Sequence, residues 1–82
     1  MNLSETVELM NSADYRERFK AEYLQLRIRT RGLEEMLKGY KFNTLTFTPS
    51  CSYELLSAQL SSMEAYAKIL EERARIEHIE LN

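Results

Sequence analysis

The chain has 82 residues, of which 44% are hydrophobic and 29% are charged, and its formal net charge is -2. This length allows one domain, and this composition is typical of a folded protein rather than a disordered one. No apolar run approaches the roughly 20 residues that cross a bilayer, and residues 1–10 lack the features of a signal peptide. We therefore expect a single-domain protein, spanning residues 1–82, that resides in the cytoplasm and does not contact a membrane.

The first half of the chain predicts a short helix followed by a long one. Residues 1–11 form a short amphipathic segment, with Ser4 as its cap, and Ser12 or Asp14 can cap the long helix that follows. Residues 13–41 are rich in good helix formers, and apolar residues at 15, 19, 23, 26, 33, 37 and 40 trace one face of a helix, with Thr30 in the gap. Gly39 stands where a C-terminal cap belongs. Gly32 lies inside this helix, at a cost of about 1 kcal/mol, and predicts that another segment approaches it closely.

The second half predicts an extended connector, a second long helix and a tail. Residues 42–52 form the connector, because Pro49 interrupts any helix and the hydroxyls on both sides of Cys51 can cap the next one. Residues 53–77 form the second helix. Its apolar stripe has the alternating four and three spacing of a coiled-coil seam, at Leu56, Leu60, Met63, Ala67, Leu70 and Ala74. In the tail, residues 78–82, alternating apolar residues predict an extended strand beside residues 45–47.

The predicted fold is all-α: an antiparallel two-helix hairpin, coiled-coil-like, with the short N-terminal helix and the connector attached. Residues 13–41 carry eight Lys and Arg against five Asp and Glu, and residues 42–82 carry three against six. Such opposite charges suit two helices that lie side by side. A lone hairpin would expose the apolar residues that lie off this seam, so we predict a homo-oligomer. These residues are Leu24, Ile28, Ile69 and Ile76.

Few residues suit metal binding or catalysis. Cys51 and His78 are the only thiol and imidazole, they are far apart in sequence, and a zinc site needs several such groups. Cys51 reads as a half-buried small residue with no disulfide partner. Nucleophilic catalysis would need Cys51 beside His78, which their separation disfavours. We expect no enzyme activity, no metal and no cofactor.

A stripe of basic residues on the first helix is the best candidate for binding. Lys20, Arg27, Arg31 and Lys38 fall on one side of the helix at about 100° per residue. Their charges suit phosphate, and the nearby Tyr23 and Tyr40 could stack on a base, so a small anionic nucleotide fits this surface. Ion pairing with the acidic second helix is the alternative. Extended nucleic acid fits poorly, because the chain is acidic overall.

A second candidate group follows the flank of the second helix. Gln59, Tyr66 and Arg73 repeat every seven residues beside the apolar seam. If a subunit boundary buried these polar groups they would need partners, supplied either by a nucleotide or by neighbouring side chains. Tyr66 and Arg73 therefore join the predicted ligand-binding residues.

Three sequence segments resemble a known family. They are DYRERFKAEYLQL, LxxML and LTFTPSCSYELLSAQLSSMEAYAKILEERARIEHIEL, and together they cover residues 14–81. The pattern resembles short uncharacterised proteins of crAss-like and other phages and prophages of gut bacteria. In size, build and charge, such proteins are similar to the phage proteins that sequester nucleotide signals of bacterial defence, the anti-CBASS and anti-Thoeris proteins, including the sequestins.

The resemblance implies a homo-oligomeric phage protein acting in the bacterial host cytoplasm. It would sequester a nucleotide immune signal, an ADP-ribose derivative or a cyclic nucleotide, in pockets between subunits. The alternative is a helical interaction module that docks a phage or host protein. An enzyme that cleaves the signal is the third possibility.

Overall fold

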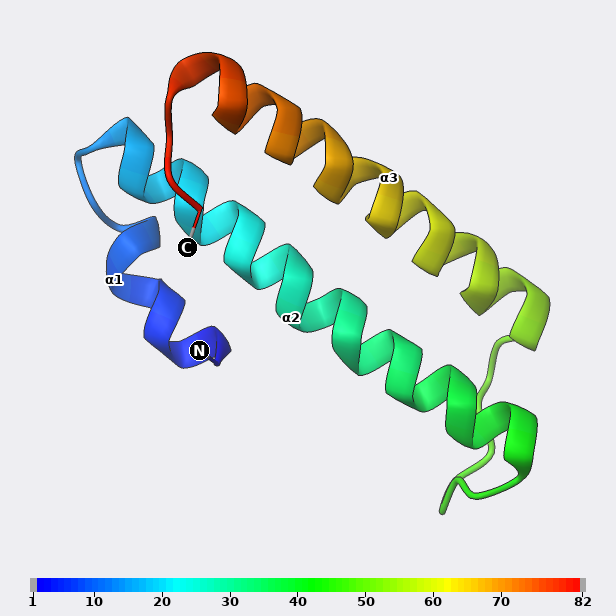
Figure 1. The fold of residues 1–82 in the computed structure, drawn as a ribbon. Helices are drawn as coiled ribbons and strands as arrows, with labels where there is room; N and C mark the ends of the chain where they lie inside the picture. Colours follow the sequence, from blue (N-terminus) through cyan, green and yellow to red (C-terminus); the bar gives the residue numbers. More distant parts are fainter. Residues whose placement is uncertain (1, 82) are drawn as a thin grey trace.

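The computed structural model describes residues 2–81, which form helices and no β-strand (Figure 1). A 3₁₀ helix, η1 (Leu3–Thr6), runs directly into α1 (Val7–Met10), and two long helices follow, α2 (Tyr15–Phe42) and α3 (Tyr53–Glu77). The prediction of an all-α fold is confirmed for these residues. None of these helices is both long and apolar enough to cross a membrane.

Polar side chains fix the starts of both long helices. The Asp14 carboxylate accepts a hydrogen bond from the Arg16 N–H at 2.9 Å, and the Ser52 hydroxyl accepts one from the Leu55 N–H at 3.1 Å. Each bond satisfies a backbone donor that has no partner within its helix. Both caps are among those that the sequence predicted.

The end of α2 differs from its prediction. The helix passes through Gly39 and ends at Phe42, because Asn43 adopts the left-handed conformation with φ 57°. The N–H of Thr44 then donates to the Gly39 carbonyl at 2.9 Å, which is the bonding of a Schellman cap. His78, with φ 56°, ends α3 in the same way.

The two long helices lie side by side and run in opposite directions (Figure 1). At the connector end, the rings of Tyr40 and Tyr53 meet edge to face, with centroids 5.6 Å apart. Near the other end, an Arg73 Nη donates to the Tyr15 hydroxyl at 3.0 Å. Contacts at both ends therefore fix how α3 is aligned along α2.

The core between these helices is small and lies toward the end away from the connector. Phe19, Leu70 and Ala74 form its buried centre. Thr30, the polar residue in the apolar stripe, is also buried, and its hydroxyl donates to the Leu26 carbonyl at 2.7 Å. That bond within the helix removes the cost of burying an unpaired hydroxyl.

The predicted position of the tail is wrong. Ile79 and Leu81 pack against the Phe19 core and not beside residues 45–47. The reason is geometric, since α3 has 25 residues and carries the chain about 37 Å away from the connector. The tail therefore covers the end of the core that the connector cannot reach.

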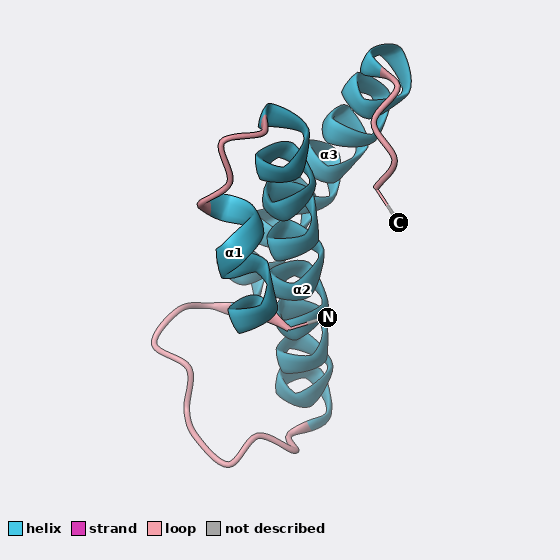
Figure 2. Cartoon of the chain, turned by 90° about the vertical axis from the view of Figure 1, so that its left-hand side faces the viewer, coloured by secondary structure: helices cyan, strands magenta, loops and turns pink. Residues whose placement is uncertain are grey.

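The N-terminal segment packs on α2, on the side away from α3 (Figure 2). Thr6 is fully buried, and its hydroxyl accepts a hydrogen bond from the Gln25 amide at 2.8 Å. Leu24 and Ile28 share this side of α2 and are half-buried. The prediction that a single chain would leave them in water is wrong, because the chain's own N-terminal segment packs on this side.

Two predictions for small residues are also wrong. A Cβ built on Gly32 meets nothing within 4 Å, so no described segment of the chain approaches it. Cys51 was expected to be half-buried, but it is exposed in the connector.

Candidate functional site

A hollow of about 480 Å³ opens where the connector end of α2 meets the start of α3. Its volume lies in the range of sites that hold small molecules. Residues of both helices line it, namely Glu34, Leu37, Lys38, Lys41 and Phe42 from α2, and Tyr53, Ser57 and Leu60 from α3. We call it the connector-end hollow.

The lining of the connector-end hollow combines aromatic rings with positive charge. Leu37 is buried beneath it, and Tyr53 is half-buried. The Phe42 ring is 68% exposed, and the Lys41 Nζ lies 5.9 Å from its centroid. Lys38 is held only by an exposed ion pair with Glu35 at 3.9 Å, and such pairs contribute little. Both ammonium groups are therefore available to an anion.

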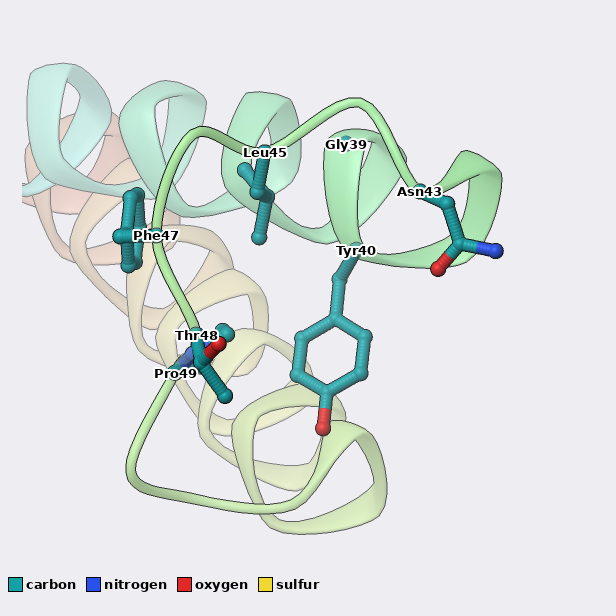
Figure 3. Close-up of a pocket in the computed structure, with 7 residues that line it drawn as sticks. All are labelled: Gly39, Tyr40, Asn43, Leu45, Phe47, Thr48 and Pro49. Carbon is teal, nitrogen blue, oxygen red and sulfur yellow. The ribbon is translucent and has the colours of Figure 1, made fainter.

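A second hollow, of about 280 Å³, lies under the connector (Figure 3). Tyr40 lines it, and because its ring also contacts Tyr53, this tyrosine pair separates the second hollow from the connector-end hollow. Gly39 permits this arrangement. A Cβ there would lie 2.7 Å from Leu45 Cδ2, so a larger residue would require the Leu45 side chain to shift. The remaining lining residues are Asn43, Leu45, Phe47, Thr48 and Pro49.

The predicted basic stripe does not form one site within the chain. Arg27 lies near the phenol of Tyr23, whose hydroxyl donates to Glu71 of α3 at 2.6 Å. Burial raises the pKa of the Tyr23 phenol, the bond to Glu71 raises this pKa further, and the Arg27 charge opposes the shift. Arg27 therefore lies near the contact that the Tyr23–Glu71 bond makes between α2 and α3. Lys38 lines the connector-end hollow instead.

The remaining basic residues of the stripe have different surroundings. Arg31 is exposed on α2, one heptad before Lys38 and on the same side of the helix. Lys20 is half-buried on α2, one heptad before Arg27. The stripe thus runs along α2 toward the connector-end hollow and enters it only at Lys38.

Tyr66 lies on the opposite flank of the helix pair. Its hydroxyl donates to the carboxylate of Glu22, which mirrors the bond from Tyr23 to Glu71. This hydrogen bond is the main cause of the raised pKa of Tyr66. A shallow hollow of about 170 Å³ adjoins it, lined by Glu22, Gln25, Leu26, Arg29 and Tyr66.

Arg73 has several partners within the chain. Its guanidinium lies 4.9 Å from the centroid of the Phe19 ring, and it also bonds the Tyr15 hydroxyl. Its Nε lies 3.7 Å from a Glu77 oxygen. Arg73 and Tyr66 thus connect the two helices through neighbouring side chains, and they are distant from Lys38 along the pair.

The sequence prediction missed Lys41, Phe42 and Tyr53 as members of the site. It ended the first helix at residue 41, which assigned Phe42 to the connector, and it treated Tyr53 only as the start of the second helix. The signal was present, because Lys38, Lys41 and Phe42 are three and four residues apart and share a helix face.

The described residues offer no assembled metal or nucleophile site. Within residues 2–81, no three His, Cys, Asp or Glu side chains come together as metal ligands. Cys51 precedes α3 and His78 follows it, so these two side chains lie about 37 Å apart and cannot act together.

Comparisons with known proteins give one family and one relative. The sequence model of a family described as Sequestin matches residues 13–76, which include almost all of α2, the connector and most of α3. The chain is 39% identical over 59 residues to an uncharacterized 7.5 kDa protein of the denB-rIIB intergenic region of Enterobacteria phage T4. That alignment covers 72% of this chain and 88% of the phage protein. No solved structure is significantly similar.

Proposed function

Because the chain belongs to the Sequestin family of small phage proteins, we propose that it sequesters a nucleotide signal of bacterial defence. The match over residues 13–76 carries this proposal. The signal would be an ADP-ribose derivative or a cyclic nucleotide. Capture would be stoichiometric, without catalysis, and would occur in the cytoplasm of the infected bacterium. The acting form would be an antiparallel helical hairpin assembled as a homo-oligomer.

The connector-end hollow is the proposed place of capture. Lys38 and Lys41 would hold the phosphates through charge-assisted hydrogen bonds, which are about twice as strong as neutral ones. Phe42 and Tyr53 would contact the base, since aromatic rings stack on any base. The Phe42 ring supports this assignment, because most of its surface is exposed and it lines the hollow.

The other predicted site residues receive separate roles in this proposal. Arg27, Arg31 and Lys20 would raise the local concentration of an anion along α2 and guide it to the hollow. Tyr40 would support Tyr53 from behind, through the edge-to-face contact. Tyr23 holds the two helices together.

The ligand would lie between subunits. Small-molecule sites bury about 70–90% of their ligand, whereas the connector-end hollow is open on one side. A neighbouring copy covering that side would complete the enclosure. In such an assembly Tyr66 and Arg73, which lie on the opposite flank, would contact other copies.

Calorimetric titration with ADP-ribose, cyclic ADP-ribose and a cyclic dinucleotide tests the proposal. At least one of these should bind, and Lys38→Ala and Lys41→Ala should each weaken that binding about 10-fold to 100-fold, because each removes a bond worth about 1.5–3 kcal/mol. Phe42→Ala should weaken it by a similar factor through lost stacking. Silence across all three probes would contradict the proposal.

Lys68→Ala is the matched control. Lys68 is an exposed lysine of α3 that does not line the hollow, so its replacement changes the net charge equally and should leave affinity within about twofold. If Lys38→Ala and Lys41→Ala bind as wild type while Arg73→Ala abolishes binding, the nucleotide lies on the other flank and our choice of site is wrong.

A protein-interaction module is the second candidate function. The N-terminal segment favours this function, because Leu3, Val7 and Met10, which are four and three residues apart, expose apolar side chains. Such a surface could dock a phage or host protein. A pull-down that recovers one stoichiometric protein and no nucleotide would support this candidate over the first.

A further inference from the structure

The outward side of α3 carries a second heptad stripe. Successive members are four and three residues apart, as in the seam that packs on α2. Its members are Leu55, Gln59, Ser62, Tyr66, Ile69, Arg73 and Ile76, and we call it the outer α3 stripe. Four of the seven members have apolar or aromatic side chains, and such residues at these heptad positions suit a coiled-coil contact with another helix.

The chain leaves the aliphatic side chains of this stripe largely uncovered, whereas Tyr66 and Arg73 also contact α2. Leu55, Ile69 and Ile76 are 60%, 58% and 61% exposed, and they share one heptad position of α3. On α2, by contrast, the half-buried Leu24 and Ile28 lie on the side against which the N-terminal segment packs. A line of apolar residues of this kind marks an association surface.

We infer that a second copy of this chain covers the outer α3 stripe, with α3 packed against α3. The inference rests on the homo-oligomer of the proposed function and names its contact surface. A copy fits because two such stripes have matching spacing and can interlock. Ala58 and Ala65 lie beside the stripe, and their small side chains let two helix backbones approach closely.

Charge favours an antiparallel pair. A parallel pair would place Arg73 against Arg73 of the other copy, and like charges placed together across an interface cost several kcal/mol. Residues 53–64 of α3 contain Glu54 and Glu64 but no Lys or Arg, while residues 65–77 contain all three basic residues of this helix. The second half also contains Glu71, Glu72 and Glu77 and is neutral overall, so an antiparallel pair places the acidic half of one helix beside a neutral half rather than beside another acidic one.

The pair would form on the flank that faces away from the proposed nucleotide site. Ser57, which lines the connector-end hollow, lies about 180° around α3 from the centre of the stripe. Pairing therefore leaves both hollows open, and enclosure of a ligand between subunits requires further copies. Tyr66 and Arg73 of both chains would meet in the α3 contact.

Light scattering on the full chain tests this contact. Wild type should show a mass of at least twice 9.7 kDa at about 100 micromolar. Ile69→Lys should reduce the mass to that of one chain, with its helix content retained because Ile69 does not pack within the chain. Ser61→Lys is the matched control, since it adds the same charge at an exposed position of α3 away from the stripe, and it should behave as wild type.

A thiol-labelling measurement covers the case in which Ile69→Lys fails to fold. With Cys51→Ser as background, Ile69→Cys should be protected from a thiol reagent at high protein concentration and should react on dilution. Ser61→Cys should react at both concentrations. A single-chain mass for wild type, or an unprotected Ile69→Cys, overturns the pairing even if nucleotide binds. A pair that binds no nucleotide overturns only the proposed function.

Discussion

Gly32 and Gly39 lie in the same helix, so replacing each with alanine makes one chemical change in two environments. Alanine is favoured over glycine inside a helix by about 1 kcal/mol. A Cβ at Gly32 would meet nothing within 4 Å. We therefore expect Gly32→Ala to raise the free energy of unfolding by about 0.5–1 kcal/mol.

At Gly39 the same change meets the connector. The new Cβ would lie 2.7 Å from Leu45 Cδ2 and 3.2 Å from Leu45 Cγ, so the half-buried Leu45 side chain must shift. Overpacking of this kind costs about 1–3 kcal/mol, which offsets the gain in helix propensity. We expect Gly39→Ala to lower the free energy of unfolding by up to about 2 kcal/mol relative to wild type.

Urea unfolding followed by circular dichroism, at one fixed protein concentration, measures both values. Leu45→Ala removes the leucine atoms that the new Cβ would meet, so in a Leu45→Ala background Gly39→Ala should no longer lower the free energy of unfolding. If Gly39→Ala stabilises the protein as much as Gly32→Ala does, then Leu45 does not pack on Gly39 and our account of the connector is wrong.

Two further predictions concern the contacts between the helices. Leu70→Ala should lower the free energy of unfolding by about 2–5 kcal/mol, because Leu70 is fully buried against Phe19. The control Lys68→Ala should change it by under about 0.5 kcal/mol. Equal effects of the two variants in urea unfolding would refute the assigned core. The pKa of Tyr23 should lie above the ordinary tyrosine value of about 10, because the folded chain favours the protonated phenol. The resulting contribution to the free energy of unfolding is fully present below a pH of about 10 and is lost as the pH rises through the pKa of Tyr23 in the folded chain. Ultraviolet titration of wild type against Tyr23→Phe measures this, and a difference midpoint at or below about 10 would count against the Tyr23–Glu71 bond.

The sequence predicted the features that depend on local spacing and capping. The helical stripes through Phe19 and Leu70, and the caps at Asp14 and Ser52, follow from periodicity and from the unpaired donors of helix ends, and both are present. The assignment of Gly39 as the C-terminal cap was wrong for a reason that lies outside the helix. Gly39 provides space for Leu45, and Asn43 takes the left-handed position instead.

The features that depend on distant packing could not be predicted from spacing. Nothing local indicated that the N-terminal segment would bury Thr6 against Gln25, so Leu24 and Ile28 were assigned to a subunit contact. The tail was assigned to strand pairing because Ile79 and Leu81 alternate, whereas they fill the open end of the core. The connector-end hollow was missed for the same reason, since Tyr53 joins Lys38 and Phe42 only when α3 folds back onto α2.

We propose that the protein captures a nucleotide and releases it unchanged. The most direct measurement is mass spectrometry of the small molecules released by heat from protein that was saturated with whichever of the three probes binds in calorimetry and then freed of excess ligand. We expect the intact nucleotide, in a fixed ratio to the chain, from wild type and much less from the variant with Lys38→Ala and Lys41→Ala. Release of cleaved products would contradict sequestration, and equal release from both proteins would contradict the proposed site.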